Sequence, residues 1–161
     1  MKNKFKLFII TLCFGFAFIG QTFISAQTEP MVPIATQQTA QCQYANSLDI
    51  VAVPGRFLNK CVTVRAKFDK FSTLGLDYSP ALRKSDDYIS FLIQRDDVKD
   101  HNIPLSEMKI FMKRTVAEKY IDLNAGDEIE FSGKVFSNAL GDVWMDADRF
   151  TVINKKEQPK K

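Results

Sequence analysis

The sequence has very few histidines and cysteines, the usual ligands of zinc and the usual partners in nucleophilic catalysis. It contains a single histidine, His101, and three cysteines in 161 residues. A structural zinc site takes about four Cys or His ligands, and a catalytic one about three protein ligands. The sequence therefore predicts no metal site and no cofactor, and it offers few side chains for nucleophilic catalysis.

The sequence also lacks an apolar run long enough to cross a bilayer as a helix. Its run "LFIITLCFGFAFIG", Leu7 to Gly20, has 14 residues, whereas a spanning helix needs about 20. Three lysines precede this run, and the small residue Ala26 follows it at a suitable cleavage point. Residues 1–26 are therefore predicted to be a signal peptide. An uncleaved anchor and a lipoprotein modified at Cys13 are the weaker alternatives.

The chain without residues 1–26 has no excess of positive charge. It keeps 19 basic and 19 acidic residues, and the stretch 27–154 has 15 basic against 18 acidic residues. A nucleic-acid-binding domain normally carries positive charge on its folded part, because neutralising phosphates dominates its affinity. The charge therefore counts against nucleic acid as a partner. The basic tail, residues 155–161, is predicted to be a disordered end.

Two cysteines remain after cleavage, Cys42 and Cys61. An even pair in an exported protein predicts a disulfide bond. Such a bond would stabilise the fold by about 3 kcal/mol through the loop that it closes. Two free buried thiols, or half of a metal site, are the alternatives.

The chain divides into a linker and one domain. Residues 27–41 are rich in Gln, Thr and Pro without periodicity, which predicts a flexible linker. Residues 42–154 form the predicted domain. Its first segment, Asn46 to Lys60, is expected to form one or two helical turns that end at Pro54-Gly55.

Alternation of apolar and polar residues predicts five strands in this domain. They are "CVTVRAKFDKF" (61–71), "YISFLIQR" (88–95), "MKIFMKR" (108–114), "NAGDEIEFSGKVFS" (124–137) and "DVWMDADRFTVI" (142–153). A change to helical period at Thr115–Leu123 predicts a short helix between the third and fourth strands. A long excursion, Ser72 to Asp87, joins the first two strands, and a turn at Asn138–Gly141 joins the last two.

Five strands with a helix between the third and fourth predict an OB-fold, a small all-β Greek-key barrel. Gly133 fits this prediction, since a glycine inside a barrel strand often marks a bulge or a bend. A seven-stranded sandwich is the alternative, but the chain would lack two of its strands and could not place the helix.

The strand segments, together with the pattern L-x-x-G-D-x-I-x-x-x-G-x-V, resemble small exported bacterial OB-fold proteins. The pattern falls on Leu123, Gly126, Asp127, Ile129, Gly133 and Val135. The resemblance covers about residues 58 to 154 and concerns turns and core positions. It implies the fold, and it leaves the ligand open, because OB-folds bind oligonucleotides, oligosaccharides or proteins.

The strand phases put aromatic and basic side chains together on the face opposite the core. The candidate ligand-binding residues are Trp144, Phe136, Phe111, Lys109, Lys134 and Arg65, with Asn138 in the turn. OB-folds stack bases on exposed aromatic rings among cations. The alternative is that these rings pack under the Cys42 segment or under the excursion.

The sequence gives less support to a catalytic site or a calcium site than to a ligand-binding face. His101 with Asp100 and Ser106 could imitate a triad, but no nucleophile elbow or oxyanion-hole motif accompanies them. Asp142, Asp146 and Asp148 are a loose set of hard-cation ligands without the spacing of a calcium loop. A solvated loop histidine and a solvated strand face are the simpler interpretations.

The sequence thus predicts a non-catalytic, exported OB-fold module, periplasmic or secreted. Its expected partner is an envelope protein or a polymeric ligand, held on the face of the second and third strands. A single-stranded nucleic-acid or oligosaccharide binder is the alternative function. A hydrolase or a metal-dependent enzyme is a more distant one.

Overall fold

A computed structural model describes residues 41–157 except 80, 100 and 101. The predicted signal peptide and the predicted linker up to residue 40 lie outside the described residues, as do His101 and Asp100 of the triad considered above. Within the described part, no helix is long and apolar enough to span a membrane.

The described chain begins with a two-residue strand and two short helices. Strand β1 is Gln43–Tyr44, helix α1 is Ser47–Ala52 and helix α2 is Pro54–Phe57. Asn46 caps α1, since its side-chain oxygen accepts a hydrogen bond from the Leu48 amide at 2.8 Å. Helix α1 ends at Ala52, just before Pro54-Gly55 as predicted, but the helical segment continues past this point. Pro54 opens α2, where its missing N–H costs nothing.

Five strands then form a closed barrel. They are β2 (Cys61–Ser72), β3 (Tyr88–Ile93), β4 (Met108–Lys113), β5 (Glu128–Ser137) and β6 (Val143–Asn154). The strand order is β2-β3-β4-β6-β5, and β5 pairs with β2 to close the ring. Only the β4–β6 contact among these is parallel. This order is that of the five-stranded Greek-key OB-fold, so the predicted fold class is confirmed.

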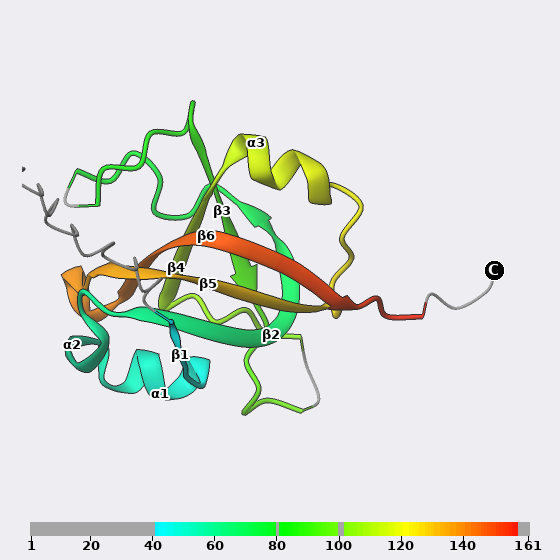
Figure 1. Cartoon of the computed structure of the whole chain (residues 1–161), viewed down its shortest axis with the longest axis horizontal. Coiled ribbons are helices and arrows are strands. Elements are labelled where there is room, and N and C mark those ends of the chain that lie inside the picture. Colours follow the sequence, from blue (N-terminus) through cyan, green and yellow to red (C-terminus); the bar gives the residue numbers. More distant parts are fainter. Residues whose placement is uncertain (1–40, 80, 100–101, 158–161) are drawn as a thin grey trace, which may run out of the picture. The chain divides into compact units, whose positions relative to one another are not determined.

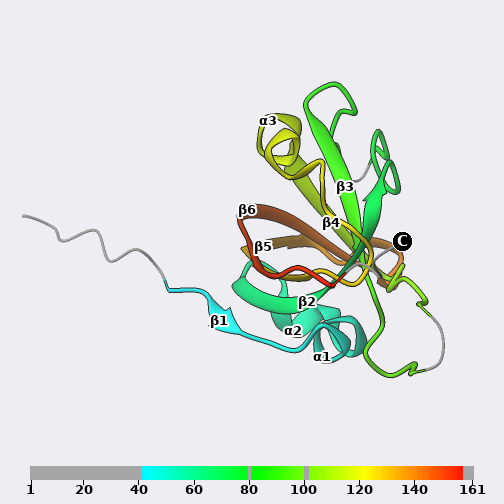
Figure 2. The same cartoon turned by 90° about the vertical axis from the view of Figure 1, so that its right-hand side faces the viewer.

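The short helix lies between the third and fourth barrel strands, as predicted, but its bounds differ. Helix α3 is Arg114–Ala117, and the 3-10 helix η1, Glu118–Tyr120, continues it. It therefore starts one residue before Thr115 and ends three before Leu123. The hydroxyl of Tyr120 donates to the Phe150 carbonyl at 2.9 Å, which ties the helix to β6. Figures 1 and 2 show α3 on the side of the barrel opposite α1 and α2.

The core follows the predicted alternation along the strands. Its fully buried members include Val62, Val64, Phe91, Ile93, Met108, Ile110, Ile129, Val135, Val143 and Met145. Ile50 of α1 and Phe57 of α2 are buried in the same cluster, so the two N-terminal helices complete the core.

A β-bulge interrupts the alternation in β6. Gly133 pairs with Ala147 while its neighbour Ser132 pairs with Arg149, so Asp148 is the extra residue. Ala147 continues the alternation of Val143 and Met145 but is only half-buried, and Phe150 takes the next core position. The bulge expected from Gly133 is therefore present, and the extra residue sits on the partner strand.

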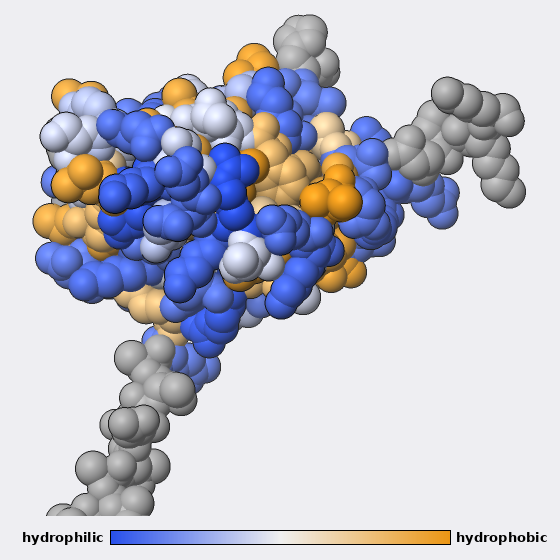
Figure 3. Space-filling model, turned by 90° about the horizontal axis from the view of Figure 1, so that it is seen from above, coloured by the Kyte–Doolittle hydropathy of each residue, from blue (hydrophilic) through white to orange (hydrophobic). Residues whose placement is uncertain are grey.

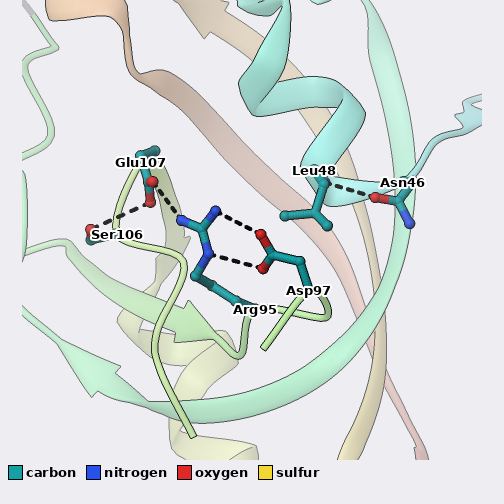
Figure 4. Close-up of polar contacts among 6 residues, drawn as sticks. All are labelled: Asn46, Leu48, Arg95, Asp97, Ser106 and Glu107. Atoms are coloured by element: carbon teal, nitrogen blue, oxygen red, sulfur yellow. Dashed lines mark hydrogen bonds and ion pairs between the residues drawn. The ribbon is translucent and has the colours of Figure 1, made fainter. Parts of the chain in front are cut away.

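One covalent bond and one group of hydrogen bonds hold segments outside the barrel strands in place. The Cys42–Cys61 disulfide is present and joins the segment before β1 to the start of β2. Figure 4 shows the group of hydrogen bonds, in the loop between β3 and β4. The Arg95 guanidinium donates to both carboxylate oxygens of Asp97, at 3.0 and 3.1 Å, and to Glu107 at 2.6 Å. The hydrogen bonds from Arg95 lower the pKa of the Asp97 carboxyl.

Candidate ligand-binding face

OB-folds bind oligonucleotides and oligosaccharides on the face of their second and third strands, between the loops that border it. Here those strands are β3 and β4. The bordering segments are the excursion, Ser72 to Asp87, and the turn between β5 and β6. Of the candidate aromatic residues, Phe111 lies on β4, while Trp144 and Phe136 lie on the next strands of the sheet, β6 and β5.

The excursion lies over this face and forms a second, smaller core with it. Trp144 and Phe111 are 2% and 0% exposed, and Ala81 of the excursion is buried with them. The Tyr78 ring stacks on the Trp144 ring, with centroids 5.1 Å apart and planes 16° apart. The Phe111 ring also stacks on the Trp144 ring, with centroids 6.0 Å apart and planes 19° apart. The chain's own tyrosine thus occupies a stacking position on Trp144.

Gly75 allows the excursion to approach this closely. It has a φ of +82°, and a Cβ placed on it would lie 3.0 Å from the Trp144 ring and 3.1 Å from the Phe111 ring. Any larger residue would need both a strained backbone and displaced rings.

Arg83 fixes the second half of the excursion to β6. Its Nε donates to Asp146 Oδ1 at 2.7 Å, and its Nη2 donates to Asp146 Oδ2, which makes a bidentate pair. The guanidinium lies 4.2 Å from the Phe136 ring centroid and 5.6 Å from that of Tyr88. The hydrogen bond to Asp146 raises the pKa of Arg83, and burial opposes this.

The three candidate aromatic residues therefore come together, but under cover. Trp144 and Phe111 are buried, and Phe136 is half-buried beneath Arg83. The Trp144 Nε1 donates to the Ala139 carbonyl at 2.8 Å, so the turn holds the indole as well. Neither Trp144 nor Phe111 presents a ring face to a ligand in this structure.

The polar candidates are scattered. Lys109 forms an ion pair with Asp142 at 2.9 Å, and Arg65 lies 3.6 Å from Glu130 on the paired strands β2 and β5. Lys134 and Asn138 are exposed. Arg65 thus belongs to another part of the barrel surface, and the structure does not bring it to the aromatic cluster.

An open groove remains beside the covered part of the face. It consists of two adjoining hollows of about 460 and 280 Å³ that share Tyr88 and Lys113. Its other lining residues are Asp86, Asp87, Arg114, Thr115, Val116, Asp146, Ala147 and Asp148. We call it the Tyr88 groove. Figure 3 looks down on the side of the molecule that bears α3, where hydrophilic residues surround a smaller apolar area.

Charges of both signs line the Tyr88 groove. Lys113 is exposed and has no ion-pair partner among the residues that the structure describes. The Arg114 Nε donates to the Ser85 carbonyl at 2.6 Å, and the Arg114 amide donates to the Asp87 carbonyl at 3.0 Å. The groove walls are therefore held in place, while Lys113 stays available.

No metal-binding group emerges among the described residues, in which no three His, Cys, Asp or Glu side chains gather closely enough. The carboxylates of Asp142 and Asp146 are engaged by Lys109 and Arg83, and Asp148 is exposed. The three aspartates considered for calcium therefore do not form one site.

Sequence reasoning missed three residues that shape this face: Tyr78, Arg83 and Tyr88. The first two lie in the excursion, which has no periodicity from which a side chain's direction could be inferred. Tyr88 is the first residue of β3, and the sequence predicts only that it begins a strand. The sequence offers one indication, an arginine in the excursion with a tyrosine five residues before it and another five residues after it.

The single tryptophan makes the covered state measurable. Changing Tyr78 to alanine should expose the Trp144 ring, shift its fluorescence emission to longer wavelength and increase its quenching by acrylamide. Leu82→Ala is the matched control, since Leu82 lies in the same excursion but is 68% exposed. Equal emission from both variants would show that Tyr78 does not shield the indole.

No protein-family model and no curated protein matches the chain. Among solved structures, an asparaginyl-tRNA synthetase from Pyrococcus horikoshii is 14% identical, with a TM-score of 0.41, over 63% of this chain and 20% of that one. A mitochondrial single-stranded DNA binding protein from S. cerevisiae is 8% identical, with a TM-score of 0.41, over 62% and 98%. An OBody bound to hen egg-white lysozyme is 11% identical, with a TM-score of 0.42, over 63% and 85%.

The chain thus spans about a fifth of the synthetase. Scores and identities this low say nothing of the ligand. The fold itself rests on the strand order and on the closing β2–β5 pairing, which make this chain an OB-fold protein.

Proposed function

We propose that this chain is a non-catalytic binding module that holds a segment of a partner protein in the Tyr88 groove. The observation that carries the proposal is the division of the OB-fold face into two parts. The aromatic part is covered by the chain's own excursion, and the Tyr88 groove next to it is open.

The chemistry of the groove suits a polypeptide. A half-buried tyrosine offers a rigid apolar ring with a polar tip, a combination common at protein interfaces. Lys113 and Arg114 supply positive charge, and Asp86, Asp87 and Asp148 supply negative charge. A peptide presents donors, acceptors and charges of both signs, whereas a polyanion would be repelled by these carboxylates.

A second candidate function is binding of single-stranded nucleic acid or of an oligosaccharide. The grouping of Trp144, Phe111 and Phe136 on one face supports it, since OB-folds use such rings as stacking platforms. Similar structures include both a single-stranded DNA binding protein and a lysozyme-bound OBody, so both ligand classes are tested. This function requires that the excursion leave the rings.

Site-specific photo-crosslinking tests the first proposal. A photoreactive phenylalanine analogue replaces Tyr88 in the full chain, and the same analogue at Tyr44, which is 71% exposed and outside the groove, is the control. We expect a discrete adduct with one protein from position 88 only, weakened by Lys113→Glu. Equal adducts from both positions, or none from position 88, would contradict the proposal.

Titration with single-stranded DNA at low salt tests the second. We expect no binding by the native chain, because its aromatic rings are covered and its charge is balanced. Binding that falls steeply as salt rises would favour the nucleic-acid function over the protein one.

We also propose that the module works outside the cytoplasm, in the cell envelope or beyond. The Cys42–Cys61 bond is compatible with this location, because disulfides persist in oxidising compartments. The intact mass of the exported protein should lack residues 1–26 and be lighter by two hydrogens than the dithiol form. A mass that keeps the leader or both thiols would contradict it.

A further inference from the structure

A second polar hollow lies at the end of the barrel where β3 and β6 finish and β5 begins. Its volume is about 280 Å³. The described residues that line it are Lys67, Gln94, Asn102, Gly126, Glu128, Asn154 and Lys156. We call it the barrel-end hollow. None of these residues takes part in the Tyr88 groove.

The frame of the barrel-end hollow is held by a buried carboxylate. Asp127 is 1% exposed, and its two oxygens accept hydrogen bonds from the backbone amides of Asn124 and Lys156, both at 2.8 Å. The Asp127 carbonyl also accepts from the Phe68 amide at 2.8 Å. The turn before β5 and the segment after β6 are thereby fixed to β2, so the hollow exists before any ligand arrives.

Positive charge in the hollow is not neutralised by an ion pair. Lys67 and Lys156 are exposed, and the described part of the chain provides neither with a carboxylate within 4.0 Å. Glu128 is the one carboxylate in the lining. The lining therefore carries a net charge of one positive unit, with three side-chain amides beside it.

A buried donor in the lining lacks an acceptor. Gln94 is 6% exposed, and its Nε2 has no hydrogen-bond partner among the described residues. Its backbone amide donates to the Lys67 carbonyl at 2.8 Å, which places the glutamine beside that lysine. A buried amide without a partner is costly, and an acceptor from a ligand would satisfy it.

Gly126 lets Lys156 lie across the hollow. Its φ is +96°, and a Cβ placed on it would lie 2.9 Å from Lys156 Cδ and 3.5 Å from Lys156 Nζ. The lysine stem thus packs on the bare glycine, and its ammonium group stays at the hollow.

We propose that the barrel-end hollow binds a small phosphate-bearing anion between the ammonium groups of Lys67 and Lys156, with the Gln94 amide as a further donor. Ammonium and amide groups together form the charge-assisted hydrogen bonds that a phosphate accepts. Glu128, the carboxylate in the lining, weakens this binding by repulsion. The proposal does not depend on the function of the Tyr88 groove.

Inorganic phosphate is the first probe, titrated into the full chain at constant ionic strength against sodium chloride. We expect saturable shifts of the Gln94 side-chain amide and of the Gly126 and Lys156 backbone amides in NMR spectra. Lys67→Met and Lys156→Met should each weaken binding about tenfold or more, the loss of one charge-assisted bond. Glu128→Gln should tighten it. Lys70→Met is the matched control, because Lys70 is an exposed lysine of the same strand outside the hollow.

A second experiment distinguishes a lipid headgroup from a soluble phosphate. It measures flotation of the protein with vesicles of phosphatidylglycerol and phosphatidylcholine. Flotation that Lys67→Met abolishes and Lys70→Met preserves would identify a lipid headgroup. Saturable binding of inorganic phosphate without flotation would identify a soluble ligand. Shifts that do not saturate, or that survive both hollow variants, would overturn the proposal.

Discussion

Replacing Gly133 with alanine is expected to lower the stability of the barrel more than the same replacement at any other described glycine. A Cβ at this position would lie 1.7 Å from the backbone oxygen of Asp146 and 2.9 Å from the Cα of Ala147. Both contacts are to backbone, which cannot rotate away as a side chain would. The β5–β6 pairing would have to open at the bulge, at a cost of about 3 kcal/mol or more.

A displaced Asp146 would also disturb the excursion, because its carboxylate binds Arg83. We therefore expect a lower urea midpoint and a red-shifted Trp144 emission in the same variant. Gly55→Ala is the matched control: its nearest contact would be the Asn138 side chain at 3.8 Å, an ordinary distance. A Gly133→Ala protein as stable as Gly55→Ala would contradict the packing described for β5 and β6.

Removing the disulfide should have the second-largest effect. The Cys42–Cys61 bond closes a loop with a sequence separation of 19, and α1 and α2 lie inside it. Those helices bring Ile50 and Phe57 into the core. Without the bond, the unfolded chain gains the entropy of an open loop, and the Cys42→Ser/Cys61→Ser double variant should lose about 3 kcal/mol of stability.

Urea unfolding with and without dithiothreitol provides the measurement. The reductant should lower the midpoint of the native chain to that of the double serine variant, and it should leave the variant unchanged. A native chain that is fully reduced by mass yet unfolds at its original midpoint would show that the bond contributes nothing to stability.

Much of the barrel could be predicted from local patterns. The alternation in "CVTVRAKF" and "MKIFMK" identifies the inward faces of β2 and β4, because a strand side chain has only two directions available. The bulge at Gly133 and the left-handed Gly141, whose φ is +79°, follow from the special place of glycine in strands and turns. The disulfide follows from the even number of cysteines that remain after the predicted signal peptide.

The helix bounds and the α2 start could not be predicted as well. Helix α3 begins at Arg114, because the chain turns directly out of β4 and Lys113 takes the cap position without a side-chain hydrogen bond. The sequence predicts that Pro54 ends a helix, but a proline is equally acceptable in the first turn of a new helix. Local residue preferences do not decide between these two roles.

The same limit applies to the candidate site: local patterns predict one part of it and not the other. By itself, the sequence determined that Trp144, Phe111 and Phe136 share the face opposite the core, since strand periodicity fixes the direction of each side chain. Whether that face meets solvent was decided only by the tertiary structure, in which Tyr78 stacks on Trp144 and Arg83 binds Asp146. Those contacts join residues 63 to 66 positions apart in sequence through an aperiodic loop. Whether a strand face is covered depends on contacts with residues far away in sequence. The periodicity of the strand itself does not predict such contacts.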